Sequence, residues 1–184
     1  SAGNASSAVV MNNSWGHDYN IQLLQTKKTE NSWSSAQAFN YYVSSTYSQS
    51  ASSIQSYVNA LDDFQDHGVV VYALTNDSSF TDADMSAGLA VLFPELDEAF
   101  IAAANVDVYW NGSALNYVLN SGPCGQTASH CLSADGTDIT LSSHVSGGLS
   151  YIANTTGTSF AAPTISGAIA LLAEHFPNQT PEQW

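Results

Sequence analysis

One segment of the chain could place a reactive hydroxyl at the start of a helix: residues 157–163, Gly-Thr-Ser-Phe-Ala-Ala-Pro. A serine hydroxyl becomes an effective nucleophile when a base removes its proton and N–H donors stabilise the oxyanion that forms. We expect Ser159 to lie where a loop enters a helix, since a helix N-terminus adds partial positive charge beside a reacting carbonyl. Pro163 fits the first turn, where backbone N–H groups have no partner within the helix. From the residues alone, an ordinary helix capped by Ser or Thr is an open alternative.

The elements around this segment favour an α/β domain. Apolar runs at residues 8–11, 69–74 and 100–106 are typical of buried parallel strands. Helical spacing of apolar residues over 54–64 precedes the second run, and a helix followed by a buried strand is the order found in three-layer α/β/α folds with a mostly parallel sheet. The helix after Ser159 is predicted to run from about 158 to 175. Its expected apolar face consists of Ile165, Ile169, Leu172 and Phe176.

The intervening stretches show weaker patterns. Residues 17–50 are interpreted as a long loop with one short helix near 34–46, and residues 107–153 as short strands and turns. Cys124 and Cys131 flank a turn that contains Gly and Pro. They form either a disulfide, which fits an exported protein, or two reduced thiols. Two cysteines at this spacing exclude a four-cysteine zinc site.

Three blocks of the sequence resemble subtilisin-like serine proteases, the subtilase family, in the order that the family has them. Residues 157–163 match every fixed position of Gly-Thr-Ser-x-Ala-x-Pro around the family's serine. Residues 9–16, which end in Ser-Trp-Gly, resemble the strand that binds the substrate backbone. Residues 68–77 resemble the strand that leads to the oxyanion-hole asparagine. The resemblance implies a subtilisin-like α/β fold and identifies residues 1–184 as the C-terminal part of one catalytic domain, incomplete and truncated at both ends.

The resemblance also implies a role for each matching residue. Ser159 is the nucleophile, and Asn76 donates its side-chain amide to the oxyanion, beside the backbone N–H of Ser159. We therefore expect the two side chains close together, with a shallow cleft alongside. The family usually has glycine where Thr75 stands, so the substrate preference of the pocket is not predicted. The two cleft walls are expected from Ser14, Trp15 and Gly16 on one side, and from Ala73, Leu74 and Thr75 on the other.

The base and acid of a Ser-His-Asp triad are not predicted within these residues. Neither Asp-Ser/Thr-Gly nor His-Gly-Thr occurs, and none of the five histidines stands where the family requires one. His17 is expected on a surface loop and His144 in a turn. We expect the missing Asp and His to precede residue 1, so that the parent protein hydrolyses peptide bonds while this chain alone does not. The alternative is a catalytically degenerate scaffold, adhesin or passenger module.

Charge and hydropathy exclude some classes of partner. The formal net charge is −14, and Lys27 and Lys28 are the only basic residues besides histidine. Such a surface repels phosphate, which excludes nucleic-acid binding. No run of about 20 apolar residues predicts a membrane span. No cofactor is needed for the expected chemistry and no metal ligands are assigned, although structural calcium is compatible with the family.

Several regions resemble the autotransporter branch of the family, including residues 93–96, the cysteine loop with residues 132–136, and Trp15. This resemblance implies export through the periplasm of a Gram-negative bacterium, to the cell surface or the medium. The expected partners are polypeptide substrates and the missing N-terminal half of the domain. Without that half, the sheet would expose an edge and an apolar face, and the fragment is expected to dimerise.

Overall fold

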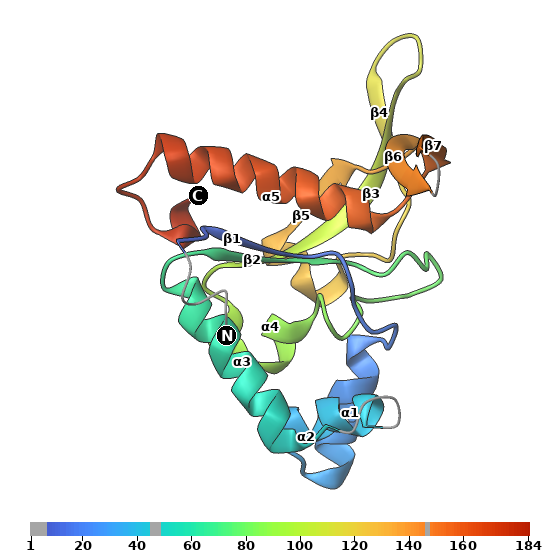
Figure 1. Ribbon diagram of the computed structural model, residues 1–184. Helices are drawn as coiled ribbons and strands as arrows, with labels where there is room; N and C mark the ends of the chain where they lie inside the picture. The colour runs from blue at the N-terminus through green and yellow to red at the C-terminus, as the bar shows by residue number, and fades with distance from the viewer. Residues whose placement is uncertain (1–6, 45–48, 146–147) are drawn as a thin grey trace.

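The apolar runs form the central strands β1 (Val10–Asn13), β2 (Val69–Ala73) and β3 (Phe100–Trp110) of the computed structural model (Figure 1). They pair in parallel in the order β1-β2-β3. The side chains of β2 are all buried and alternate between two core clusters, one on each face of the sheet. Burial on both faces is why residues 69–74 form an unbroken apolar run. The structure describes residues 7–44, 49–145 and 148–184.

The long strand β3 has two further partners. Its first half pairs in parallel with β5 (Cys131–Asp135), and its second half pairs antiparallel with β4 (Leu115–Leu119). The β3–β4 hairpin projects from the body of the molecule (Figure 1). A separate antiparallel pair is formed by β6 (Ile139–Val145) and β7 (Gly148–Thr155). The sheet is therefore mixed but mostly parallel, as predicted.

Helices cover both faces of this sheet (Figure 1). One face carries α1 (Ile21–Asn31), α2 (Ser35–Val43), α3 (Ala51–Gln65) and the short α4 (Leu89–Leu92), and the other carries α5 (Thr158–His175). The α/β architecture with helices on both sides confirms the predicted fold class. None of the helices in the described ranges is long and apolar enough to cross a membrane. Short 3₁₀ segments lie at Pro94–Leu96, Gly125–His130 and Pro181–Gln183.

Helix α1 lies within the stretch that the sequence assigned to a loop, so that interpretation was wrong. The Asn20 side chain caps the helix by accepting from the backbone N–H of Gln22 at 2.9 Å. Only Ile21 and Leu24 of its 11 residues are buried. Its other side chains are polar or partly exposed, so the apolar periodicity that marks an amphipathic helix is missing. The second helix, predicted near 34–46, is α2.

Helix α5 has the predicted bounds, but part of its expected buried face is exposed. Ile165 and Ile169 pack against β2 and β3 together with neighbouring alanines. Leu172 and Phe176 were expected beside them, yet their exposed fractions are 37% and 42%. The buried stripe instead continues to Ala173, because residues spaced by four lie on one side of a helix. Leu171 is 68% exposed, so the outer side of α5 is apolar as well.

Cys124 and Cys131 form a disulfide. The residues between them make a 3₁₀ helix. This loop is fastened to the body of the protein through Asp82, whose Oδ1 accepts from the backbone N–H of Gln126 and whose Oδ2 accepts from the Gln126 side chain, both at 2.8 Å. Gly125 approaches the same carboxylate with φ +52°, where an added Cβ would clash with Asp82. The disulfide loop therefore holds the segment that precedes Asp84.

Candidate active site

Ser159 is the second residue of α5, so its side chain lies at the helix N-terminus as expected. The helix start rests on the end of β5 through two glycines, with Gly157 N donating to Gly136 O at 3.0 Å. A Cβ at position 136 would lie 2.5 Å from Gly157 O and 3.0 Å from Ala161 N. Only glycine allows this approach without displacing backbone. The close contact between the two glycines therefore fixes where the helix begins and where Ser159 stands.

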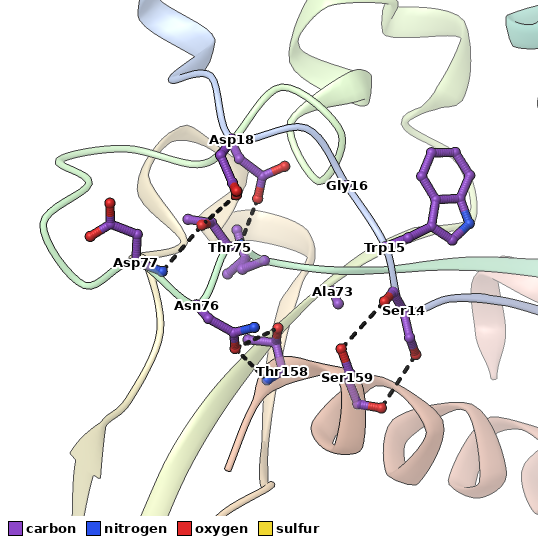
Figure 2. Close-up of a pocket in the computed structure, with 12 residues that line it drawn as sticks. Ser14, Trp15, Gly16, Asp18, Ala73, Thr75, Asn76, Asp77, Thr158 and Ser159 are labelled. Atoms are coloured by element: carbon purple, nitrogen blue, oxygen red, sulfur yellow. Dashed lines mark hydrogen bonds between the residues drawn. The ribbon is translucent and has the colours of Figure 1, made fainter. Parts of the chain in front are cut away.

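The side chain of Asn76 meets this helix start from the end of β2 (Figure 2). Its Oδ1 accepts from Thr158 N at 2.8 Å and from Thr158 Oγ1 at 3.1 Å. A backbone N–H can only donate, so the atom of Asn76 that faces it must be the carbonyl oxygen. This leaves the Nδ2 amide as the end that can donate to an incoming group. Asn76 thus accepts from the first backbone N–H of α5, and this bond takes the place of a hydrogen bond from an N-cap side chain.

Ser159 and Ser14 exchange two hydrogen bonds across the cleft (Figure 2). Ser159 Oγ donates to Ser14 O, and Ser14 Oγ donates to Ser159 O, each at 3.3 Å. Both are long, so the Ser159 hydroxyl is weakly held and can turn to another acceptor.

The two expected cleft walls leave the sheet at one edge. Strands β1 and β2 are parallel, with Asn13 paired to Tyr72, so the residues after each strand stand side by side. Ligand sites of parallel α/β sheets commonly lie at this carboxyl edge. A pocket of about 430 Å³ opens here, and its lining brings together all eight of the predicted nucleophile, oxyanion and wall residues: Ser14, Trp15, Gly16, Ala73, Leu74, Thr75, Asn76 and Ser159.

Three aspartates that line the same pocket, Asp18, Asp77 and Asp84, were not predicted as site residues from the sequence, and the carboxylates of Asp18 and Asp84 contact Thr75. Asp18 Oδ1 accepts from Thr75 Oγ1 at 2.7 Å. Asp84 Oδ2 accepts from Thr75 N at 2.8 Å, and its Oδ1 accepts from the backbone N–H groups of Ser86 and Ala87. Each carboxylate therefore contacts the wall formed by residues 73–75. Burial raises the pKa of Asp84 to about 6, against the three N–H donors that lower it.

No histidine lines this pocket among the side chains that the structure describes. His17 lies in a loop, as expected, but its side chain is partly buried: its Nδ1 lies 3.2 Å from Ser86 Oγ, and burial lowers its pKa. Position 144 belongs to β6, so the expected turn was wrong, and its side chain lies outside the described residues. The described pocket therefore brings together the residues predicted as nucleophile, oxyanion donor and cleft walls, without a histidine among its described lining.

Within the described ranges, no three His, Cys, Asp or Glu side chains are grouped so that they could hold a metal ion. The carboxylates of the pocket bond to backbone N–H groups and to the Thr75 hydroxyl. These donors orient the carboxylates of Asp18 and Asp84.

Comparison with known proteins assigns the chain to a protease lineage. Residues 2–184 match the model of the subtilase family. The extracellular serine protease of Serratia marcescens is 29% identical in an alignment of 136 residues in length that covers 64% of this chain and 12% of that protein. The protease domain of PatA, solved as a mutant, is 19% identical with a TM-score of 0.55, over 99% of this chain and 50% of that one. Sphericase is also 19% identical, with a TM-score of 0.50, over 80% of this chain and 51% of its own.

The chain thus spans about half of each of these two structures and a smaller share of the Serratia protein. At these identities, the two structures show a shared fold, and the match to the family model carries the family relationship.

Proposed function

This chain belongs to the subtilase family, and on that premise we propose that the protein containing it hydrolyses peptide bonds by acyl transfer through Ser159. The strongest support is the meeting of Asn76 with the start of α5, where the carbonyl of the amide is engaged by Thr158 and the N–H₂ is left to donate. A hydroxyl, a side-chain amide and a helix N-terminus at one pocket mouth are the parts that acyl transfer requires.

In the proposed reaction, Ser159 Oγ attacks the carbonyl carbon of the scissile peptide while a base takes its proton. The carbonyl oxygen becomes an oxyanion, which accepts hydrogen bonds from Asn76 Nδ2 and from the backbone N–H of Ser159. The base then returns the proton to the leaving amine as the peptide bond breaks. Water, deprotonated by the same base, attacks the acyl-enzyme, and the base returns that proton to Ser159 Oγ as the ester bond breaks. The Ser159 hydroxyl must first leave its long bond to Ser14 O to reach the base.

We further propose that a histidine, oriented by an aspartate, supplies this base from a part of the protein outside these residues. An unpaired strand edge and an exposed apolar helix face support a larger catalytic domain. β1 pairs only with β2 among the described strands, which leaves its other edge open. The outer side of α5 exposes Leu171, Leu172 and Phe176, and helices that are apolar all round are typically buried. The remaining half of the domain would extend the sheet beyond β1 and cover α5.

Export to the cell surface or the medium is part of the same proposal. The disulfide fits an oxidising compartment, and the Serratia relative is an extracellular protease. Polypeptides are the proposed substrates, and an autotransporter origin is the specific form of export that the sequence resemblance suggests.

The test uses the protein expressed from its complete coding sequence and a fluorophosphonate probe, which labels activated serines. We expect labelling of the unsubstituted protein and its loss in Ser159→Ala. Ser56→Ala removes an exposed hydroxyl on α3 and serves as the matched control that keeps its label. A folded protein that takes no label would contradict the proposal and favour a scaffold or adhesin that has lost catalysis.

A further inference from the structure

We propose that the pocket beside Ser159 selects a basic residue, Arg or Lys, immediately before the scissile bond, and that Asp18 binds its charge. The inference rests on the proposed function, because it assigns a substrate class to the same cleft. It starts from the carboxylates of the pocket, which the chemistry at Ser159 does not use.

The pocket is acidic, and neither lysine of the chain belongs to its lining. Asp18, Asp77 and Asp84 all line it. The only two lysines of the chain lie on α1, where Lys27 Nζ pairs with Glu30 at 2.7 Å and Lys28 Nζ donates to Ser35 at 2.9 Å. Clefts lined by one sign of charge concentrate ligands of the opposite sign. A cationic side chain would therefore be drawn to this pocket.

Asp18 is the carboxylate best placed to meet that cation. It is exposed, and its Oδ1 accepts from Thr75 Oγ1 at 2.7 Å. An ionised carboxylate has about four acceptor positions, so most of its capacity remains for a ligand. Thr75 belongs to the opposite wall, so this bond holds the Asp18 side chain across the space between the two walls (Figure 2). Thr75, where the family usually has glycine, therefore orients the Asp18 carboxylate through its hydroxyl.

Asp84 is buried and contacts the backbone of the same Thr75 that binds Asp18. Its exposed fraction is 1%, and both oxygens already accept backbone N–H groups. A Cβ on Gly16 would lie 3.4 Å from its Oδ1, so Asp84 closes the floor between residue 16 of one wall and Thr75 of the other. The charge of Asp18 adds to the burial that raises the pKa of Asp84. A cation bound at Asp18 would relieve this repulsion, so Asp84 contributes attraction without direct contact.

The shape of the pocket also suits a long basic side chain. Its volume of about 430 Å³ lies within the range of small-ligand pockets. Gly16 and Ala73 offer small flanks for a methylene stem. A guanidinium can then bind a carboxylate through two parallel hydrogen bonds. Asp77 contributes less to binding of the cation, because its Oδ1 accepts from Ser79 N at 2.9 Å and its carboxylate turns away from Asp18 in Figure 2.

The experiment measures kcat/KM with peptides that differ only in the residue before the scissile bond, Arg or citrulline. Citrulline has nearly the shape of arginine without its charge. With the protein from its complete coding sequence, we expect Arg to be preferred on the order of tenfold or more, the range of a charge-assisted hydrogen bond. Asp18→Asn should remove most of this preference and leave only the weaker attraction of Asp84 and Asp77. Asp63→Asn, the same change at an exposed position of α3, should leave the ratio unaltered.

Fluorophosphonate labelling separates the two proposals. A protein that is not labelled refutes the proposed function, and the assigned specificity with it. A labelled protein that cleaves Arg and citrulline peptides equally well overturns the specificity alone. A preference of undiminished size in Asp18→Asn overturns the assignment to Asp18. The comparison of the two peptides in the unsubstituted protein needs no variant, and a melting curve verifies that Asp18→Asn is folded.

Discussion

Asn76 and Thr158 are joined by two hydrogen bonds across 82 residues of sequence, from the Thr158 backbone N–H and hydroxyl to Asn76 Oδ1. The pair does two things at once. It satisfies the first backbone donor of α5, and it turns the amide N–H₂ of Asn76 away from the helix. The orientation of the proposed oxyanion donor is therefore fixed by the helix that carries the proposed nucleophile.

Replacing Asn76 by alanine should lower kcat about 100- to 1000-fold with little change in KM, since an oxyanion donor acts mainly in the transition state. Thr158→Val keeps the backbone N–H and removes only the hydroxyl, so a smaller loss of about 2- to 10-fold is expected. Steady-state kinetics on the complete protein measures both. An Asn76→Ala enzyme with unchanged kcat would show that another group binds the oxyanion.

Asp84 should make the protein less stable as the pH rises from about 4 to about 6. The folded state raises the pKa of this carboxyl from 3.8 to about 6, so within this window the folded state binds more protons than the unfolded state. The free energy of unfolding then falls with rising pH, by up to about 3 kcal/mol.

Urea unfolding of the wild type and of Asp84→Asn across this pH range isolates the effect, since other groups titrate in both proteins. The stability of the wild type relative to the variant should decrease as the pH rises. A difference that does not change with pH would show that Asp84 titrates normally.

Breaking the Cys124–Cys131 disulfide should lower the free energy of unfolding by about 2 to 3 kcal/mol, the loop-closure contribution expected for a sequence separation of 7. Urea unfolding with and without a reductant measures the loss. The double variant Cys124→Ser/Cys131→Ser should match the reduced protein and show no response to reductant. Equal stability of the oxidised and reduced proteins would contradict this expectation.

The apolar outer side of α5 offers a test of the proposed larger domain. In the complete protein, Leu171→Lys should destabilise by about 2 kcal/mol or more if another layer covers this residue, because a charge would be buried. Leu23→Lys, at a half-exposed position of α1, is the matched control and should have little effect. Thermal melting compares the two variants. Equal melting temperatures would mean that the outer side of α5 faces solvent.

The central strands and α5 could be predicted because their buried residues form apolar runs or apolar residues at helical spacing in the sequence. β2 is covered on both faces and is therefore continuously apolar. Helix α1 shows the opposite case, since it has only two buried residues. Its position is set by a distant contact, in which Ile21 N donates to Ala83 O and Met85 N donates to Tyr19 O. The residues of α1 alone show no pattern from which these hydrogen bonds could be predicted.

Some residues of the candidate site could likewise be predicted from the sequence, and others could not. Ser159, Asn76 and the wall residues each end a strand or begin a helix, and short motifs mark them. Asp18 and Asp84 carry no such motif. They reach the pocket because the chain after β1 bridges to the segment around residue 84, with Asn20 paired to Asp84. A contact made between segments that far apart in sequence appears only once the chain is folded.

The bonds between Ser14 and Ser159 span 145 residues, and this separation has a consequence for synthesis of the protein. A ribosome releases Ser14 and Asn76 long before the residues of α5. Until that helix emerges and packs onto the sheet, Ser14 and Asn76 do not have Ser159 beside them. Under the proposed function, peptide cleavage therefore requires that α5 has been synthesised and has packed onto the sheet.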